Sequence, residues 1–278
     1  MGATINLKKE FPSILDSAYA QYKRNLSRYK EAREIMSKDV ITTSPESSME
    51  EAARTMGAKH IGSLIVKKYE TPVGIVTERD LLTKILAAGK DPSTEKVENS
   101  MSYPLVKIGV NAKIKEAAQM MTRNKSRLAV FDAGYLVGIV TASDLIKSLP
   151  EVPETAVKVD DFMTKKVVTA DEKTSVIDIA KTMGKERIGS VLITRDEKPF
   201  GIFTERDLLT EFLAKGKSLN SEVGKAASSP LVTIPSGANV HMAAITMAMK
   251  HIRRLPVTSL DKLVGVITAR DLVEAYAK

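Results

Sequence analysis

The chain has 278 residues, of which 43% are hydrophobic and 27% charged, a balance typical of soluble globular proteins rather than of disordered chains. No apolar run approaches the roughly 18 residues that a membrane-spanning helix needs, which argues against a channel or transporter. Cysteine is absent, so disulfides, thiolate metal sites and cysteine nucleophiles are excluded, and a cytoplasmic location is expected. The net charge of +8 favours anionic partners, and nucleotides, nucleic acid and acidic proteins are all open.

Residues 1–33 form an extension with its own character. Apolar side chains recur at helical spacing, beginning with Phe11, Ile14 and Leu15, and basic residues accompany them. We expect this N-terminal extension to be helical. It could pack as an extra helix on the first module or dock onto an acidic partner, and both interpretations are open.

Four copies of a short pattern, Gly-x-x-Thr-x-x-Asp, occur in the rest of the chain. Their glycines are separated by 64, 63 and 64 residues, which indicates an internal repeat. The glycines are Gly74, Gly138, Gly201 and Gly265.

Each pattern is preceded by apolar residues at i, i+3, i+4 and i+7, as in Met49, Ala52, Ala53 and Met56. This spacing predicts one face of an amphipathic helix. A β-rich run such as 64–66 follows, and a second strand then enters the glycine pattern. After each Asp we expect another helix, as over Leu81 to Ala88. The repeats therefore predict an α/β (α+β) fold in which each unit is strand, helix, strand, strand, helix.

The repeats alternate in sequence. The first and third share Thr-Glu-Arg-Asp-Leu-Leu-Thr at 77–83 and 204–210, whereas the second and fourth have Thr-Ala-x-Asp-Leu. We infer that a two-unit module was duplicated with an offset of 127 residues. The predicted boundary lies near Ser148–Lys158, where Pro150 and Pro153 interrupt a charged stretch.

The Thr-x-x-Asp spacing has two interpretations. It is typical of a capping box at the start of a helix, with the glycine serving either a strand end or close backbone approach. A strand-to-helix turn also presents backbone N–H groups at a positive dipole end, and nearby arginines make an anion site there plausible. An Asp beside a phosphate site can accept hydrogen bonds from ribose hydroxyls, so a nucleotide is the ligand indicated.

At these residues the chain resembles the CBS domain (cystathionine β-synthase domain) over residues 34–278. The implied motifs cover about 34–95, 96–150, 159–221 and 222–278. They would pair into two Bateman modules, 34–150 and 151–278, in a disk-like assembly. A chain of four motifs is similar to the regulatory gamma subunit of AMP-activated protein kinase and its archaeal counterparts.

The resemblance implies which residues bind the nucleotide. The motif aspartates would bind the ribose: Asp80, Asp144, Asp207 and Asp271. The residues expected at the phosphates are Thr77, Thr141, Thr204, Thr268, Arg127, Arg254, Arg79, Arg206, Arg270 and Arg253. Those expected beside the base are Thr42, Ile61, Gly62, Thr169, Ile188 and Gly189. We expect the best-formed sites where Asp80 faces Arg127 and where Asp207 faces Arg254.

No enzyme or metal motif occurs, so we expect no catalytic residues, no metal and no catalytic cofactor. The hypothesis is a regulatory sensor that binds AMP, ADP or ATP and transmits energy state to a protein partner, such as a kinase. A homodimer is open, and no membrane association is expected. Two alternatives are a nucleic-acid-binding regulator, given the basic charge, and a protein that binds another adenosyl ligand such as S-adenosylmethionine.

Overall fold

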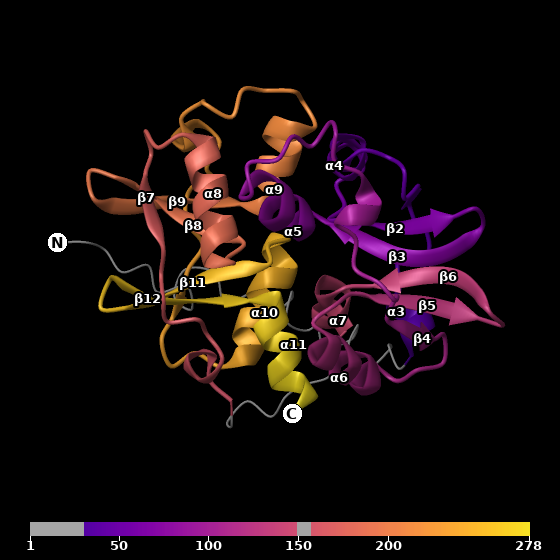
Figure 1. The fold of residues 1–278 in the computed structure, drawn as a ribbon. Helices are drawn as coiled ribbons and strands as arrows, with labels where there is room; N and C mark the ends of the chain where they lie inside the picture. The colour runs from indigo at the N-terminus through magenta and orange to yellow at the C-terminus, as the bar shows by residue number, and fades with distance from the viewer. Residues whose placement is uncertain (1–30, 149–156) are drawn as a thin grey trace. The chain divides into compact units, whose positions relative to one another are not determined.

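Four three-stranded sheets, one per repeat, organise the chain in a computed structural model that describes residues 31–148 and 157–278 (Figure 1). In each sheet the first strand is parallel to the second, and the second is antiparallel to the third. The predicted α/β fold of four like units is therefore confirmed. Residues 1–30 of the extension predicted to be helical (1–33), and the prolines Pro150 and Pro153, lie outside the described residues.

The first repeat shows how the sequence pattern builds each unit. Strand β1 (Thr42–Thr43) leads into helix α4 (Met49–Ala58), which crosses over so that β2 (Ser63–Lys68) lies parallel to β1. A tight turn brings β3 (Thr71–Thr77) back antiparallel to β2. This order of strand, helix, strand, strand is the one that the sequence predicts.

The other repeats have the same order. The second contains β4 (Lys107–Gly109), α6 (Ile114–Asn124), β5 (Leu128–Asp132), β6 (Tyr135–Val140) and α7 (Ala142–Ser148). The third contains β7 (Thr169–Asp171), α8 (Val176–Glu186), β8 (Ser190–Arg195), β9 (Lys198–Thr204), α9 (Glu205–Asp207) and the π-helix η4 (Leu208–Leu213). The fourth contains β10 (Ile234–Pro235), α10 (Val240–Lys250), β11 (Arg254–Ser259), β12 (Lys262–Thr268) and α11 (Ala269–Ala277).

The apolar face of each crossover helix is buried, as predicted. Helices of 10 or 11 residues are marginal in isolation, so this buried face supplies most of their stability. The buried residues are Met49, Ala52, Ala53 and Met56; Ile114, Ala117, Ala118 and Met121; Val176, Ile179, Ala180 and Met183; and Val240, Ala243, Ala244 and Met247.

The helix that follows the motif begins earlier than predicted. In the first repeat, helix α5 (Glu78–Asp80) starts directly after Thr77 and continues into the π-helix η1 (Leu81–Leu86). The sequence predicts a start at Leu81. The difference arises because Thr77 caps the helix, which places the motif Asp inside the first turn.

Each repeat is preceded by a short helical segment, and only the first of these overlaps a predicted helix, that over residues 1–33. These segments are α3 (Ala32–Ile35) and the 3₁₀ turns η2 (Val97–Asn99), η3 (Val159–Asp161) and η5 (Val223–Lys225). Each continues into a residue pair with the last strand of a neighbouring repeat. After η2, for example, Ser102 and Ile75 exchange backbone hydrogen bonds of 2.8 and 2.9 Å. The connecting segments therefore extend the sheets of neighbouring repeats.

These connecting segments explain the motif glycines. A Cβ placed on Gly74 would lie 2.8 Å from Met101 Sδ and 3.0 Å from the Ser102 carbonyl oxygen, both in the segment after η2. Gly138, Gly201 and Gly265 meet the corresponding segments in the same way. The close backbone approach that the sequence predicts for this glycine is therefore confirmed.

The described repeats form two compact units. Unit 1 combines the second and fourth repeats, over 31–38, 106–148, 157–166 and 233–278. Unit 2 combines the first and third repeats, over 39–105 and 167–232. In unit 2, α4 packs on η4 and α8 packs on η1; in unit 1, α6 packs on α11. Each unit thus takes one repeat from each predicted module, and the module boundaries stay a prediction.

Candidate functional site

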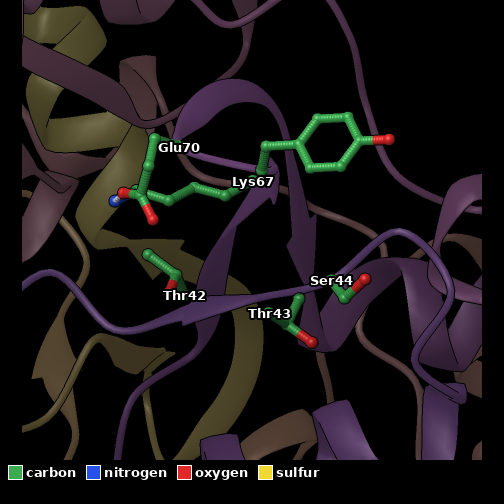
Figure 2. Close-up of a pocket in the computed structure, with 6 residues that line it drawn as sticks. Thr42, Thr43, Ser44, Lys67 and Glu70 are labelled. Atoms are coloured by element: carbon green, nitrogen blue, oxygen red, sulfur yellow. Dashed lines mark hydrogen bonds and ion pairs between the residues drawn. The ribbon is translucent and has the colours of Figure 1, made fainter.

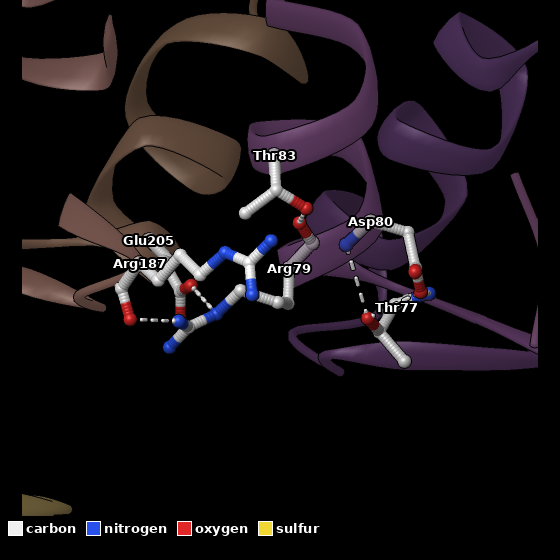
Figure 3. A network of polar contacts seen from close by, with 6 residues as sticks. All are labelled: Thr77, Arg79, Asp80, Thr83, Arg187 and Glu205. Carbon is white, nitrogen blue, oxygen red and sulfur yellow. Dashed lines mark hydrogen bonds and ion pairs between the residues drawn. The ribbon is translucent and has the colours of Figure 1, made fainter. Parts of the chain in front are cut away.

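In the first repeat the motif threonine and aspartate form a reciprocal cap at the start of α5 (Figure 3). The Thr77 amide donates to Asp80 Oδ2 at 3.0 Å, and the Thr77 hydroxyl donates to the same oxygen at 2.6 Å. In return, the Asp80 amide donates to Thr77 Oγ1 at 3.2 Å. The capping role predicted from the Thr-x-x-Asp spacing is confirmed.

The other repeats share this geometry. In each, the threonine hydroxyl lies 2.7 Å from Oδ2 of the aspartate, in the pairs Thr141–Asp144, Thr204–Asp207 and Thr268–Asp271. The return bond from the aspartate amide is present in the third and fourth repeats, at 3.3 and 3.4 Å. In the second repeat that amide donates to the Thr141 carbonyl at 3.1 Å. One carboxylate oxygen of every motif aspartate is therefore held in place.

The cap limits what the motif threonines can do for a ligand. A threonine hydroxyl has a single hydrogen, and here the ionised aspartate accepts it. Contact with a phosphate through this hydroxyl would require the hydrogen to turn away from the aspartate. We therefore expect these threonines to act on a ligand chiefly by orienting the aspartate, and their direct phosphate contact stays a prediction.

The backbone amides at the motif turn are also occupied. In the first repeat the Thr77 and Asp80 amides serve the cap, and the Glu78 amide donates to the Gly62 carbonyl at 3.2 Å. In the third repeat the Glu205 amide donates to Gly189 at 3.1 Å. The sequence predicts amides open to an anion, and for these groups the prediction is wrong because nearby acceptors satisfy them. These four amides are therefore not available to an anion.

Burial shifts the titration of two motif aspartates. It raises the pKa of Asp144 and of Asp271 above the ordinary 3.8, while hydrogen bonds from Thr141 and Thr268 oppose the rise. These carboxylates have lost water that they would contact in an unfolded chain. Hydrogen-bond donors on a ligand would replace that water.

Arg79 lies between Thr77 and Asp80 in sequence, yet its side chain leaves them for the third repeat (Figure 3). Its Nε forms an ion pair with Glu205, and its Nη1 donates to the Arg187 carbonyl at 2.7 Å. Within unit 2, Arg79 thus joins the first repeat to the third.

Arg206 makes the reciprocal contacts with the first repeat. Its Nη1 donates to the His60 carbonyl at 3.0 Å, and its Nε lies 4.0 Å from Glu78 Oε2. Glu78 and Glu205 are each only 5% exposed, so two carboxylates are buried where the motif turns meet. Sequence reasoning missed these glutamates, although the identical Thr-Glu-Arg-Asp of the two repeats was an available signal.

The remaining predicted phosphate-binding arginines belong to unit 1. Arg127, Arg253 and Arg254 are half-buried at or just before the central strands β5 and β11, and Arg270 is exposed on α11. Asp80 and Asp207 belong to unit 2. The pairings of Asp80 with Arg127 and of Asp207 with Arg254 therefore stay predictions.

The residues predicted beside the base lie in unit 2. Thr42 lines an open hollow whose other walls come from residues 43–44 and from the end of the β2–β3 hairpin, Lys67, Tyr69 and Glu70 (Figure 2). Thr169 is exposed at the equivalent position. The remaining four, Ile61, Gly62, Ile188 and Gly189, link a crossover helix to its central strand. Their place beside a base stays a prediction.

No helix in 31–148 or 157–278 combines the length and apolar character that crossing a membrane requires. Within the same ranges, no group of three or more His, Asp or Glu side chains is arranged to hold a metal ion.

Known proteins resemble this chain along most of its length. The family model of the CBS domain matches four segments, residues 32–87, 96–151, 159–214 and 222–278. The protein MJ1225 of Methanocaldococcus jannaschii is 31% identical over 195 residues, covering 65% of this chain and 69% of that protein. MK0525 of Methanopyrus kandleri is 37% identical over 120 residues, covering 42% of this chain. The chain spans 61% of the length of MK0525.

Solved structures share the fold. The crystal structure of MJ1225, described as a candidate archaeal homologue of γ-AMPK, has a TM-score of 0.71 at 20% identity and covers 89% of this chain and 100% of that one. An uncharacterized conserved protein from Pyrococcus horikoshii has a TM-score of 0.60 at 20% identity, covering 88% and 99%. With four matched segments and the capped motif in every repeat, the chain belongs to the CBS-domain family.

Proposed function

We propose that this chain is a regulatory protein that binds AMP, ADP or ATP and passes the energy state of the cell to a protein partner. Family membership supports the proposal, as does the fold shared with a candidate archaeal homologue of γ-AMPK. The fourfold Thr–Asp cap supports it chemically, because it presents a fixed carboxylate in every repeat.

The observation that carries the proposal is the hydrogen bonding of the two motif aspartates in unit 1. Among the described residues, hydrogen bonds reach the carboxylates of Asp144 and Asp271 only at Oδ2, from Thr141 and Thr268. A carboxylate oxygen can accept two hydrogen bonds, so Oδ1 has room for both hydroxyls of a ribose. Those hydroxyls would also replace the water that burial has removed.

Arginines are the proposed phosphate ligands. A guanidinium forms bidentate, charge-assisted bonds with phosphate oxygens, which suits Arg127, Arg254, Arg253 and Arg270. At Arg79 and Arg206 a phosphate would compete with the buried glutamates and backbone carbonyls that these guanidinium groups contact within unit 2.

Regulation would follow from binding. A ligand shifts a protein between two shapes only by its different affinity for each, so AMP and ATP would act differently if their phosphates contact different arginines. The proposed partner is a cytoplasmic protein, such as a kinase, and a second copy of the chain is another proposed partner.

The proposal is tested by calorimetric titration of AMP, ADP, ATP and S-adenosylmethionine into the intact chain and into a triple variant, Asp144→Asn, Asp207→Asn and Asp271→Asn. We expect adenine nucleotides to bind the unaltered chain. The variant should bind about tenfold or more weakly, because a hydrogen bond to a charged group is worth about 1.5–3 kcal/mol. The matched control changes three exposed aspartates near the hairpin tips of the same repeats, Asp132→Asn, Asp196→Asn and Asp261→Asn, and should bind normally.

Three results would contradict the proposal. Equal affinity of the triple variant and the control would remove the ribose role of the motif aspartates. Preference for S-adenosylmethionine over all three nucleotides would change the ligand class. Salt-dependent binding of an oligonucleotide, with no binding of nucleotides, would favour a nucleic-acid-binding regulator.

A further inference from the structure

The first repeat differs from the others at the second oxygen of its motif aspartate. Lys84, one turn further along in η1, places Nζ 2.8 Å from Asp80 Oδ1. The same Nζ donates to the Ser100 carbonyl at 2.5 Å. The ammonium group thus joins the motif turn to the segment that follows η2.

Both partners of Lys84 are buried. Asp80 is 6% exposed and Ser100 is 2% exposed, whereas the other three described motif aspartates are half-buried. An Asp–Lys pair at i, i+4 on an exposed helix contributes little and exchanges readily with water. This pair is different, because the ammonium group lies against a buried carboxylate and a buried carbonyl.

The contacts of Asp80 limit how many hydrogen bonds its carboxylate can still accept from a ribose. Asp80 Oδ2 already accepts two hydrogen bonds from Thr77, and the Lys84 ammonium group forms an ion pair with Oδ1. A carboxylate has about four acceptor positions, two at each oxygen, and the ammonium group lies against the two that remain at Oδ1 of Asp80. A ribose needs two, one for each hydroxyl. Asp144 and Asp271 retain two at Oδ1 among the described contacts.

No other repeat carries a cation at the position of Lys84. The equivalent residues are Ser148, Glu211 and Ala275. Ser148 donates to backbone carbonyls of its own helix, and Glu211 forms an ion pair with Lys215 at 2.7 Å. The arrangement at Lys84 is therefore particular to the first repeat.

We infer that Lys84 is an internal occupant of the ribose position at Asp80, so that nucleotide is excluded from the first repeat while this lysine is in place. Lys84 is then a specificity-determining residue that makes the four motif sites unequal. The inference rests on the proposed function. It also revises the ranking drawn from the sequence, in which the Asp80 site was one of the two best formed.

The test counts AMP bound per intact chain, by calorimetry and equilibrium dialysis. The unaltered chain should bind at most three AMP. Two variants, Lys84→Gln and Lys84→Met, are made separately, so that a folding defect in one leaves the other as a test. Each should bind one more AMP per chain than the unaltered protein. Adding Asp80→Asn to either should remove that extra AMP. The control Lys215→Gln removes an exposed lysine just after the equivalent helix η4 in the same unit, and should leave the count unchanged.

Several outcomes would overturn the inference. Four AMP bound by the unaltered chain would show that the Asp80 site is open. Weaker binding or fewer AMP in both Lys84 variants would make the lysine a phosphate ligand, and an unchanged count in both would make it a structural residue. If no variant and no unaltered chain binds AMP, the proposed function fails, and the inference fails with it.

Discussion

Four basic residues, one per repeat, adopt a left-handed backbone conformation at or just after the end of a crossover helix. His60, Lys125, Arg187 and His251 have φ values of 54°, 49°, 54° and 54°. This conformation costs most L-residues energy and favours glycine. In unit 2 two of these residues also join the repeats, because the carbonyls of His60 and Arg187 accept hydrogen bonds from Arg206 and Arg79.

Lys125 provides a test of this backbone strain, because it is exposed and caps α6. We expect Lys125→Gly to raise the free energy of unfolding by a few tenths to about 1 kcal/mol, because glycine adopts this φ without a Cβ clash. Lys125→Ala removes the same side chain but keeps the Cβ, and should bring no such gain. Urea unfolding of both variants measures the difference, and an alanine variant as stable as the glycine variant would contradict the argument.

The raised pKa of Asp271 predicts a pH-dependent stability. Since its folded pKa exceeds 3.8, the native state binds more protons than the unfolded state between 3.8 and the folded value. The free energy of unfolding should therefore fall as the pH rises through that window. The Asn side chain of Asp271→Asn is neutral at every pH. The free energy of unfolding of this variant, relative to that of the unaltered chain, should therefore rise from about pH 4 to pH 7. A difference that does not change with pH, in urea unfolding, would contradict this.

At the scale of elements, much of the fold follows from sequence periodicity. The apolar spacing of the four crossover helices predicts a buried face on each, the β-rich runs after them predict buried strands, and these faces and runs are all buried. The short helical segments η2, η3 and η5 could not be predicted, because three residues give no periodic pattern. Their positions depend on contacts with a neighbouring repeat, which the local sequence does not encode.

Two glycines in unit 2 lie where helical segments pack tightly on one another. A Cβ on Gly57 of α4 would overlap Cβ of Ala214, just after η4, and Gly184 of α8 meets Ala87 in the same way. We expect Gly57→Ala to lower the free energy of unfolding by about 1–3 kcal/mol, because the packed helices cannot separate freely.

Two further variants decide the cause of that loss. Ala214→Gly should restore part of the stability to Gly57→Ala, since it removes the overlapping atom. Gly109→Ala is the control, because a Cβ there would meet nothing within 4 Å. Thermal unfolding in which Gly57→Ala is no more damaging than Gly109→Ala would contradict the packing argument.

At the scale of the molecule, the pairing of repeats was the least predictable feature. The Thr–Asp caps follow from local spacing, so the sequence predicts them in all four repeats. The burial of Glu78 and Glu205 depends on which repeats pack together, and no local pattern states that. The structure explains why the first and third repeats both carry this glutamate, because each glutamate lies near the arginine of the other repeat.

The exchanged ion pairs predict a thermodynamic coupling within unit 2. Arg79→Gln leaves the buried Glu205 without this arginine and should lower the free energy of unfolding by about 1–3 kcal/mol. The loss should be smaller than for a fully buried pair, because the Arg79 side chain is 41% exposed. The double variant Arg79→Gln with Glu205→Gln should cost less than the sum of the two single variants. Lys215→Gln, at an exposed ion pair, should cost less than about 1 kcal/mol. If chemical denaturation shows that the double variant loses as much unfolding free energy as the two single variants together, the coupling is refuted.

The central claim is that motif aspartates bind the ribose of an adenosine nucleotide, and a crystal structure of the intact chain with AMP tests it most directly. We predict both ribose hydroxyls within about 3.2 Å of Oδ1 of Asp144 or Asp271, with Oδ2 still held by the motif threonine. AMP bound elsewhere, with the ribose away from every motif aspartate, would contradict the claim and leave the Thr–Asp pairs as helix caps alone.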